Sequence, residues 1–271
     1  MKKVDDRYLE LAVAAAKEAG RIQMLHLGHA HPVEYKGEFN PVTEIDRLCE
    51  RTIVGMISDA FPEHDILTEE SPFEGKGSAW KWIIDPLDGT TNYFHGFPCF
   101  CVSIGLEIEG EVKAGVVYIP TLNELFHGQK GKGAFLNGKR IAVSEINKLN
   151  RSFLCTGFPY DVHEHADFYL RYFRQFLTKG FAIRRPGSAA MDLSYLAAGR
   201  FDGFWEFKLH PWDVAAATLM ITEAGGRVSD LAGRPYSIYS EEILASNGSV
   251  HEEMIQAVQE IEENKGLGFR G

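Results

Sequence analysis

The sequence is short of cysteine, has no long hydrophobic run and carries no excess of positive charge. Its four cysteines include no Cys-x-x-Cys pair, which indicates reduced thiols of the kind kept in the cytoplasm. The longest apolar stretches are shorter than a membrane span, and the N-terminal residues lack the apolar core of a signal peptide. These absences predict a cytoplasmic protein without a membrane partner.

The charge balance is acidic, with a formal net charge of −10. Nucleic-acid backbones are bound by basic surfaces, so a general nucleic-acid binder is not expected. A small anionic substrate is compatible with this charge if a metal ion or local cations reverse the field at its site. The rest of the composition, 45% hydrophobic and 24% charged residues, is that of a globular protein.

The first half of the chain, residues 1–145, has the pattern of two helices and an antiparallel sheet. Helical spacing of apolar residues covers the first twenty-odd residues and residues 49–60. Strand-like runs follow, and the pair Asn137 and Gly138 between two of them is typical of a two-residue hairpin.

The second half, residues 146–271, alternates helices and strands, which predicts helices flanking a sheet. No Pro-rich or Ser-rich linker separates the halves, so they should pack as one body. The expected fold is a layered αβαβα sandwich of α+β and α/β character, and the whole chain, residues 1–271, should form one domain.

The most informative segment is a short apolar run that ends in two acids, Asp85 and Asp88. Carboxylates at the end of a buried strand have lost their water, and a hard cation would offset that loss. The Gly-Thr-Thr turn from Gly89 onward can present backbone N–H groups to an anion. This segment predicts a divalent metal beside a phosphate.

Further acids lie at the edges of predicted buried elements, namely Asp46, Glu69, Glu70 and Asp213. All of these acids except Asp46 also have a simpler interpretation: a surface loop for the glutamates, an Asx turn for Asp85 and Asp88, and a favoured acid at a helix N-terminus for Asp213. Taken together, they favour a metal site because they all supply hard oxygen ligands. The spacing excludes the Asp-x-Asp-x-Thr motif of haloacid-dehalogenase-type phosphatases, and Leu87 breaks an EF-hand pattern.

These motifs resemble those of the inositol monophosphatase family of Mg²⁺-dependent, lithium-sensitive phosphatases. The segment from Trp82 to Asn92 matches the family's aromatic-x-x-Asp-Pro-x-Asp-Gly-Thr-x-Asn motif. The later Trp-Asp-x-Ala and Glu-Ala-Gly-Gly segments are also present, beginning at Trp212 and Glu223. Two supporting segments contain Asp46 and the Glu69-Glu70 pair, and the resemblance runs from the first predicted helix to the last.

The resemblance implies a role for each acid. Glu69, Asp85 and the Leu87 carbonyl would hold a first Mg²⁺, whereas Asp85, Asp88 and Asp213 would hold a second. Two such metals about 3.5–4 Å apart clamp an in-line displacement. Thr90 and Asp46 would hydrogen-bond the attacking water, and Glu70 would assist through a metal-bound water.

The resemblance also implies the substrate contacts. Backbone N–H groups of Gly89 and Thr90 would cradle the phosphate, Lys36 would lie near it, and Asp88 would accept a hydrogen bond from a ring hydroxyl. The sugar-like ring would contact Gly187, Ser188, Ala189 and Glu206. Arg184 and Arg185 could bind a second phosphate or form ion pairs with surface acids. The histidines at 26, 29 and 31 are expected to lie in a solvated loop.

The function implied is hydrolysis of myo-inositol monophosphates, small phosphorylated polyols, by a Mg²⁺-dependent homodimer. Three alternatives stay open. The first is another sugar phosphate, such as fructose 1,6-bisphosphate, and the second is a nucleotide such as 3′-phosphoadenosine 5′-phosphate, because a few loop contacts decide specificity. Some relatives in this family have regulatory roles and bind RNA polymerase or RNA, so a protein partner is the third alternative.

Overall fold

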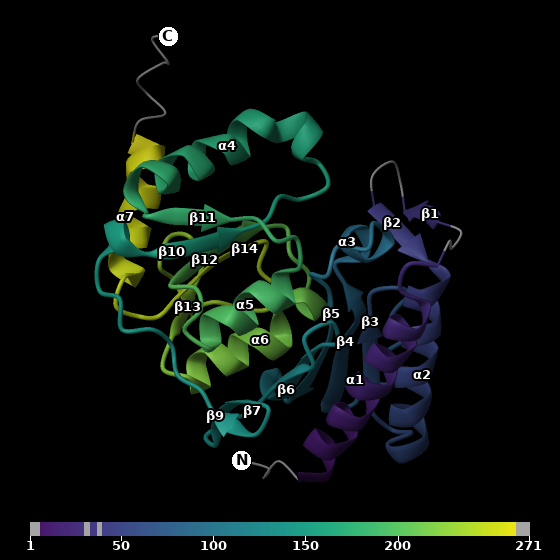
Figure 1. Ribbon diagram of the computed structural model, residues 1–271. Helices are drawn as coiled ribbons and strands as arrows, with labels where there is room; N and C mark the ends of the chain where they lie inside the picture. The colour runs from purple at the N-terminus through teal and green to yellow at the C-terminus, as the bar shows by residue number, and fades with distance from the viewer. Residues whose placement is uncertain (1–5, 30–32, 37–39, 264–271) are drawn as a thin grey trace.

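The computed structural model describes residues 6–29, 33–36 and 40–263, without the side chains of residues 33–36, 40, 41, 262 and 263. Five layers follow one another across the molecule (Figure 1): two helices, a seven-stranded sheet, two central helices, a five-stranded sheet and two outer helices. The expected αβαβα sandwich is confirmed. Among the described residues, no helix combines the length and the hydropathy needed to cross a bilayer.

The first layer consists of α1 (Asp6–His26) and α2 (Glu44–Ala60). The two helices bury most of the periodic apolar residues that predicted them, including Ala16 of α1 and Ile53 of α2, whereas Ala60 is exposed. Thr43 caps α2, because its hydroxyl accepts hydrogen bonds from the first backbone N–H groups while Asp46 accepts the N–H of Thr43. The short pair β1 (Val33–Lys36) and β2 (Asn40–Thr43) precedes this cap.

The first sheet has the strand order β3-β4-β5-β6-β7-β8-β9. Its strands are β3 (Asp65–Thr68), β4 (Trp80–Asp88), β5 (Cys101–Ile108), β6 (Glu111–Ile119), β7 (Glu124–Gln129), β8 (Gly133–Leu136) and β9 (Lys139–Arg140). The hairpin at Asn137 and Gly138 is confirmed, with both residues at positive φ.

The prediction of a wholly antiparallel first sheet is wrong at one edge, because β3 runs parallel to β4. Thr68 pairs with Ile84 in this register, so Glu69, which follows the last residue of β3, and Asp85 of β4 lie at the same end of the sheet. The connection between β3 and β4, residues 69–79, therefore leaves the sheet beside Asp85. The apolar pattern did not indicate this direction, since parallel and antiparallel edge strands have similar patterns.

The second sheet has the order β11-β10-β12-β14-β13 and mixes parallel with antiparallel pairs. Its strands are β10 (Phe153–Thr156), β11 (Ala182–Arg184), β12 (Gly203–Phe207), β13 (Arg227–Ser229) and β14 (Glu242–Ser246). The outer helices are α4 (Val162–Lys179) and α7 (His251–Glu263), and the central ones are α5 (Ala189–Ala197) and α6 (Pro211–Glu223). The predicted alternation is confirmed, although β10 and β13 were not predicted.

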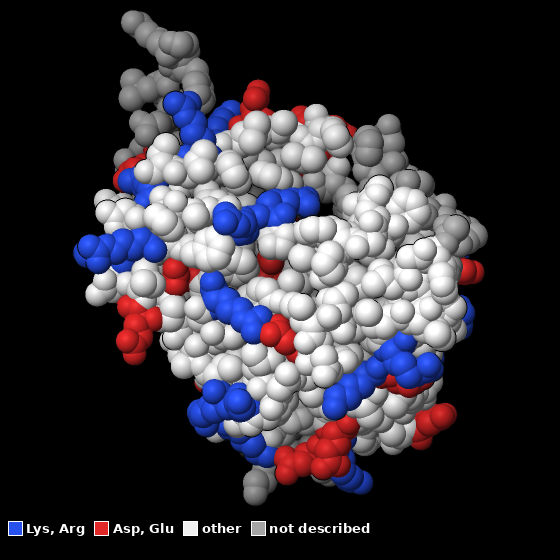
Figure 2. Space-filling model, viewed as in Figure 1, with Lys and Arg blue, Asp and Glu red and all other residues white. Residues whose placement is uncertain are grey.

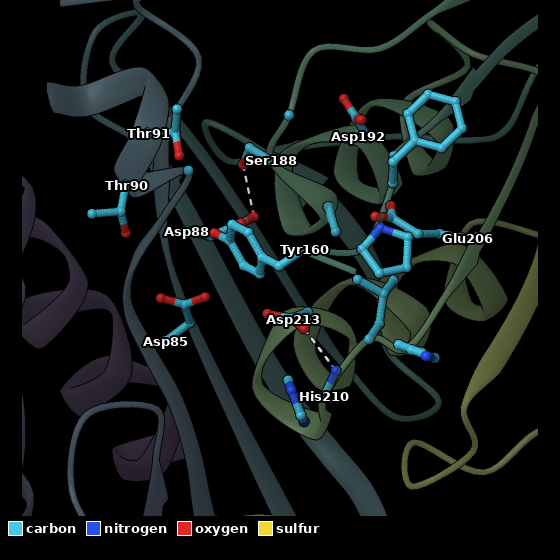
Figure 3. Close-up of a pocket in the computed structure, with 18 of the residues that line it drawn as sticks. Asp85, Asp88, Thr90, Thr91, Tyr160, Ser188, Asp192, Glu206, His210 and Asp213 are labelled. Carbon is cyan, nitrogen blue, oxygen red and sulfur yellow. Dashed lines mark hydrogen bonds between the residues drawn. The ribbon is translucent and has the colours of Figure 1, made fainter. Parts of the chain in front are cut away.

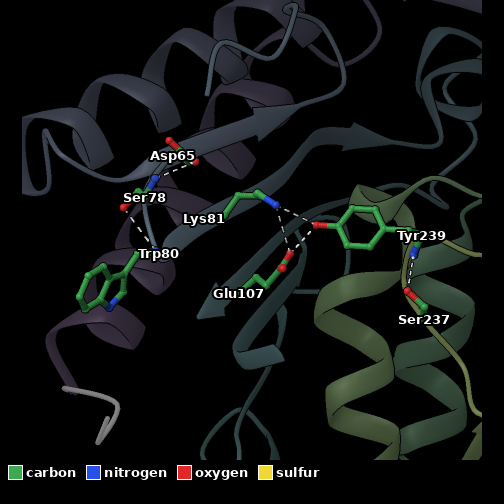
Figure 4. Close-up of polar contacts among 7 residues, drawn as sticks. All are labelled: Asp65, Ser78, Trp80, Lys81, Glu107, Ser237 and Tyr239. Carbon is green, nitrogen blue, oxygen red and sulfur yellow. Dashed lines mark hydrogen bonds and ion pairs between the residues drawn. The ribbon is translucent and has the colours of Figure 1, made fainter. Parts of the chain in front are cut away.

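The central helices join the two sheets into one core. Every residue of α5 except Tyr195 is buried, and buried residues of α5 and α6 pack in one cluster with Val117 of β6 and Phe204 of β12. A polar contact also joins the halves (Figure 4): Lys81 on β4 donates to Tyr239 Oη at 3.1 Å, and the Tyr239 hydroxyl donates to Glu107 on β5.

The surface in Figure 2 shows Lys and Arg interspersed with Asp and Glu, without a broad area of one sign on this face. The four cysteines are free thiols, three of them buried and Cys99 partly exposed.

Candidate active site

The site begins where β4 ends. The register of β4 against β5 shifts between Asp85, which pairs with Ser103, and Asp88, which pairs with Cys101, so the two acids flank an irregularity at the end of the strand. Asp85 is only 1% exposed, and its Oδ1 accepts the Leu87 N–H at 2.9 Å. The Asx turn considered from the sequence is therefore present. It occupies one oxygen of Asp85 and is compatible with a ligand role for the other.

Gly89 connects β4 to the short helix α3 (Thr90–Phe94). Its φ of 96° lies in the left-handed region, and a Cβ at this position would lie 2.8 Å from the Cys99 carbonyl oxygen. Only glycine satisfies both conditions without strain. The backbone geometry of the Gly-Thr-Thr turn therefore requires glycine at position 89, and the same geometry places Thr90 next to the acids.

Thr90 is hydrogen-bonded to Asp46 of α2, with its Oγ1 donating to Asp46 Oδ1 at 2.9 Å. The other oxygen of Asp46 accepts the Thr43 N–H at 2.8 Å and the Thr43 hydroxyl. Burial raises the pKa of Asp46, and the hydrogen bonds from Thr43 and Thr90 oppose the rise. Asp46 therefore caps α2 with one oxygen and orients Thr90 with the other.

Asp213 reaches the same place from the opposite half of the chain. It lies in the first turn of α6, two residues after Pro211, and its Oδ2 accepts the His210 N–H at 2.7 Å. The helix-capping interpretation is thus confirmed. Ligand oxygens of Asp85, Asp88 and Asp213 nevertheless lie within 4.8 Å of one another, and Figure 3 shows the three carboxylates facing a common space.

The three aspartates have raised pKa values, and for each of them burial is the largest cause. Repulsion from Glu69 and from Asp88 raises the pKa of Asp85 and of Asp213 further. Buried carboxylates held this close are stabilised when a cation neutralises them. Their hard oxygen donors fit Mg²⁺, which prefers carboxylate, carbonyl and water ligands.

A cavity of about 760 Å³ opens over these acids. It brings together most of the residues predicted from the sequence, namely Glu69, Asp85, Leu87, Asp88, Gly89, Thr90, Gly187, Ser188, Ala189, Glu206 and Asp213. The segment after β11 is attached directly to the acids, because Asp88 Oδ2 accepts the Ser188 hydroxyl at 2.7 Å and the Ala190 N–H at 2.8 Å.

Several predicted residues lie elsewhere. Glu70 does not line the cavity, and its backbone N–H donates to Glu50 of α2. Arg184 stacks over Phe153, 4.9 Å from the ring centre, and only Arg185 of the arginine pair lines the cavity. The side chain of Lys36 lies outside the described residues.

The prediction that the histidines lie in a loop is wrong for His26, which is the last residue of α1. His29 follows in a turn, and the rings of His26 and His29 are 6.4 Å apart. His31 lies outside the described residues. Neither His26 nor His29 lines the cavity.

The far end of the cavity contains residues that the motifs did not single out. Asp192 of α5 is buried there, and no described group donates a hydrogen bond to its Oδ1. Burial raises the pKa of Asp192 and, to about 8, that of Glu206. Gly157 makes room for Glu206, because a Cβ on residue 157 would lie 2.1 Å from Glu206 Oε1. One signal was available: Asp192 follows Ser188 by one helical turn.

Comparison with known proteins gives consistent results. The inositol monophosphatase family matches residues 5–263. A putative Nus factor SuhB from Neisseria meningitidis serogroup B is 41% identical over 93% of this chain and 97% of its own. A fructose-1,6-bisphosphatase/inositol-1-monophosphatase from Aquifex aeolicus is 39% identical over 93% and 96%.

A solved structure of inositol monophosphatase from Anabaena superposes with a TM-score of 0.86, at 40% identity over 94% of this chain and 96% of that one. Sequence and fold thus agree over nearly the whole chain, and the protein belongs to the inositol monophosphatase family.

Proposed function

We propose that this protein is a Mg²⁺-dependent phosphomonoesterase that hydrolyses myo-inositol monophosphates to inositol and phosphate. The observation that carries the proposal is the meeting of Asp85, Asp88 and Asp213 at one cavity. Family membership supports a phosphatase, and the choice of Mg²⁺ and of an inositol phosphate is our inference from the donor set and the motifs.

The metal end of the cavity would hold Mg²⁺ through Glu69, Asp85, the Leu87 carbonyl, Asp88 and Asp213. When bound, Mg²⁺ supplies positive charge to the phosphate and acidifies coordinated water. Beside these ligands, the Thr90 hydroxyl is positioned to accept a hydrogen bond from the attacking water while donating its own proton to Asp46 Oδ1. The raised pKa of Asp46 makes it a better proton acceptor than an exposed aspartate.

Water attack on phosphorus breaks the bond to the ester oxygen of the polyol, which leaves as an alcohol after gaining a proton. Backbone N–H groups of Gly89 and Thr90 would orient the phosphate, and Gly187, Ser188 and Ala189 would contact the ring. With its pKa near 8, Glu206 carries a proton at neutral pH and can donate or accept a hydrogen bond. A hydroxyl-rich ring is suited to such a partner. Lys36 would lie near the phosphate, and Glu70 would assist through a metal-bound water.

A bisphosphate sugar is the second candidate substrate. Arg185 and Lys208 line the same cavity and provide positive charge there, although Lys208 is ion-paired with Asp161. The relative from Aquifex aeolicus is named as a phosphatase of both substrates. A regulatory role with a protein partner is the third candidate, because other relatives are named Nus factors. The homodimer, the lithium sensitivity and the cytoplasmic location stay predictions.

The test is phosphate release from inositol 1-phosphate and fructose 1,6-bisphosphate, each with and without Mg²⁺. We expect Mg²⁺-dependent turnover with a higher kcat/KM for inositol 1-phosphate. A strong preference for the bisphosphate would change the substrate but keep the chemistry. Absence of Mg²⁺-dependent release from either substrate would contradict the proposal and favour the regulatory role.

A further inference from the structure

The segment between β3 and β4, residues 69–79, carries two of the proposed active-site acids but has little packing to hold it. It leaves the sheet directly after Thr68. All side chains from Ser71 to Gly77 are exposed, including that of Phe73. Because exposed loops have few buried contacts to restrict them, specific polar contacts decide where such a segment lies.

One such contact comes from Glu50 of α2, a carboxylate that the motifs did not single out. Glu50 is only 5% exposed. Its Oε2 accepts the backbone N–H of Glu70 at 3.0 Å, and its Oε1 accepts the Ser71 hydroxyl. Both oxygens of one buried carboxylate are thus directed at the two residues that follow Glu69.

Glu50 also lies one helical turn after Asp46, so the two side chains share a face of α2. Asp46 orients Thr90, and Glu50 holds the segment that contains Glu69 and Glu70. One helix face therefore positions two separate parts of the proposed site. Neither α2 carboxylate is counted among the proposed metal ligands, and Glu50 does not line the active-site cavity.

The far end of the same segment is held by a different carboxylate, which provides a matched control. Asp65 Oδ1 accepts the Lys76 N–H at 2.6 Å, and its Oδ2 accepts the Ser78 N–H at 3.2 Å. Figure 4 shows Asp65 beside Ser78, at the start of β4. Asp65 and Glu50 are both buried acids that accept hydrogen bonds from this segment, but only Glu50 acts at the end that carries Glu69.

We propose that Glu50 is a positioning residue for the metal site: it holds residues 69–71 so that Glu69, which lines the cavity, faces the three aspartates before Mg²⁺ arrives. This inference rests on the proposed Mg²⁺ site. Without Glu50, Mg²⁺ binding would have to order the segment itself, and the conformational entropy lost at that moment would weaken the binding. Once Mg²⁺ saturates the site, the chemical step should be little changed.

The experiment is calorimetric titration of Mg²⁺ into the full chain without substrate, with the Mg²⁺ dependence of turnover measured in parallel. We expect Glu50→Ala to weaken Mg²⁺ binding about tenfold or more, with kcat at saturating Mg²⁺ largely recovered. Glu50→Gln should stay within about threefold of wild type, because the amide can accept from the Glu70 N–H and donate to Ser71 Oγ. Asp65→Ala should lower thermal stability and leave Mg²⁺ affinity unchanged.

Three results would overturn the inference: unchanged Mg²⁺ affinity in Glu50→Ala, equal weakening in Asp65→Ala, or a Glu50→Gln variant as weak as Glu50→Ala. The last result would assign the effect to the charge of Glu50. If Glu50→Ala does not fold, Ser71→Ala decides, since Ser71 is exposed and its change removes one of the two hydrogen bonds. Its Mg²⁺ affinity should fall severalfold, and wild-type affinity would contradict the inference. A wild-type chain that binds no Mg²⁺ would instead contradict the proposed function.

Discussion

The two ends of the cavity are built differently. At the metal end, three acids accept a hydrogen bond from backbone close to them in sequence: Asp85 from Leu87, Asp213 from His210 and Asp46 from Thr43. Asp88 differs, because it accepts from Ser188 and Ala190 of the other half of the chain. At the substrate end, Glu206 comes from a central strand, and no described group donates to Asp192 Oδ1. Local turns and caps thus organise most of the metal end, whereas the substrate end depends on which strands and helices meet.

The largest expected effect comes from breaking the metal end. Asp213→Asn keeps the shape of the side chain but removes a charge that faces Asp85 and Asp88. We expect a loss in kcat/KM of at least about a hundredfold. The metal-free protein should become more stable, because one member of a repelling buried group is gone. Steady-state kinetics and thermal unfolding without Mg²⁺ test both statements, and near-normal turnover at millimolar Mg²⁺ would contradict the assignment.

Changing Thr90 should separate proton transfer from metal binding. Thr90→Val keeps the branched shape and removes the hydroxyl that donates to Asp46. We expect kcat to fall about a hundredfold, the lower range for loss of general acid–base assistance. Mg²⁺ affinity should stay near that of wild type, in contrast to Asp213→Asn. Equal loss of Mg²⁺ binding in both variants would show that Thr90 supports the metal rather than the water.

At the substrate end, Glu206 should give a pH-dependent stability. Its pKa in the folded protein is about 8, above the ordinary 4.5, so the folded state holds a proton that the unfolded state has lost between these values. The contribution of Glu206 to stability therefore falls as pH rises through this window. The fall should be on the order of a few kcal/mol.

Glu206→Gln should remove that part of the fall. Urea unfolding without Mg²⁺ at pH 5 and pH 9 measures it, with the variant more stable than wild type at pH 9 and similar at pH 5. Parallel curves for the two proteins would show that Glu206 does not hold its proton at neutral pH.

The smallest effect should come from Gly157→Ala, which touches only the position of Glu206. The new Cβ would lie 2.1 Å from Glu206 Oε1 and would displace the carboxyl group. Loss of one substrate hydrogen bond corresponds to about 1 kcal/mol, so KM for inositol 1-phosphate should rise about fivefold. Mg²⁺ affinity and kcat should stay unchanged. A change in Mg²⁺ affinity would mean that the two ends of the cavity are coupled.

Much of the fold could be predicted because its elements have strong local patterns. The periodic alanines of α1, the Asn137–Gly138 turn and the Pro-Trp-Asp start of α6 each indicate their structure within a few residues. The parallel direction of β3 and the strand β10 could not be predicted in this way. Both depend on partners distant in sequence, since β10 lies between β11 and β12 in the sheet.

The same distinction holds for the candidate site. The acids of the metal end stand out because polar residues interrupt buried elements there, and such interruptions are visible in a sequence. Glu50 looks like any charged residue on a helix, and Gly157 like any loop glycine. Only the contact of Glu50 with Glu70 and the approach of Glu206 to Gly157 distinguish them.

The amino-acid sequence by itself determined the order of helices and strands, the family, and the acids that end buried elements. These features follow from side-chain periodicity and from backbone geometry over a few residues. The tertiary structure alone decided that Asp213 meets Asp85 and Asp88, that α2 holds the segment of Glu69, and that Asp192 and Glu206 share one end of the cavity. These features depend on the packing of α5 and α6 between two sheets, which brings together residues more than a hundred positions apart.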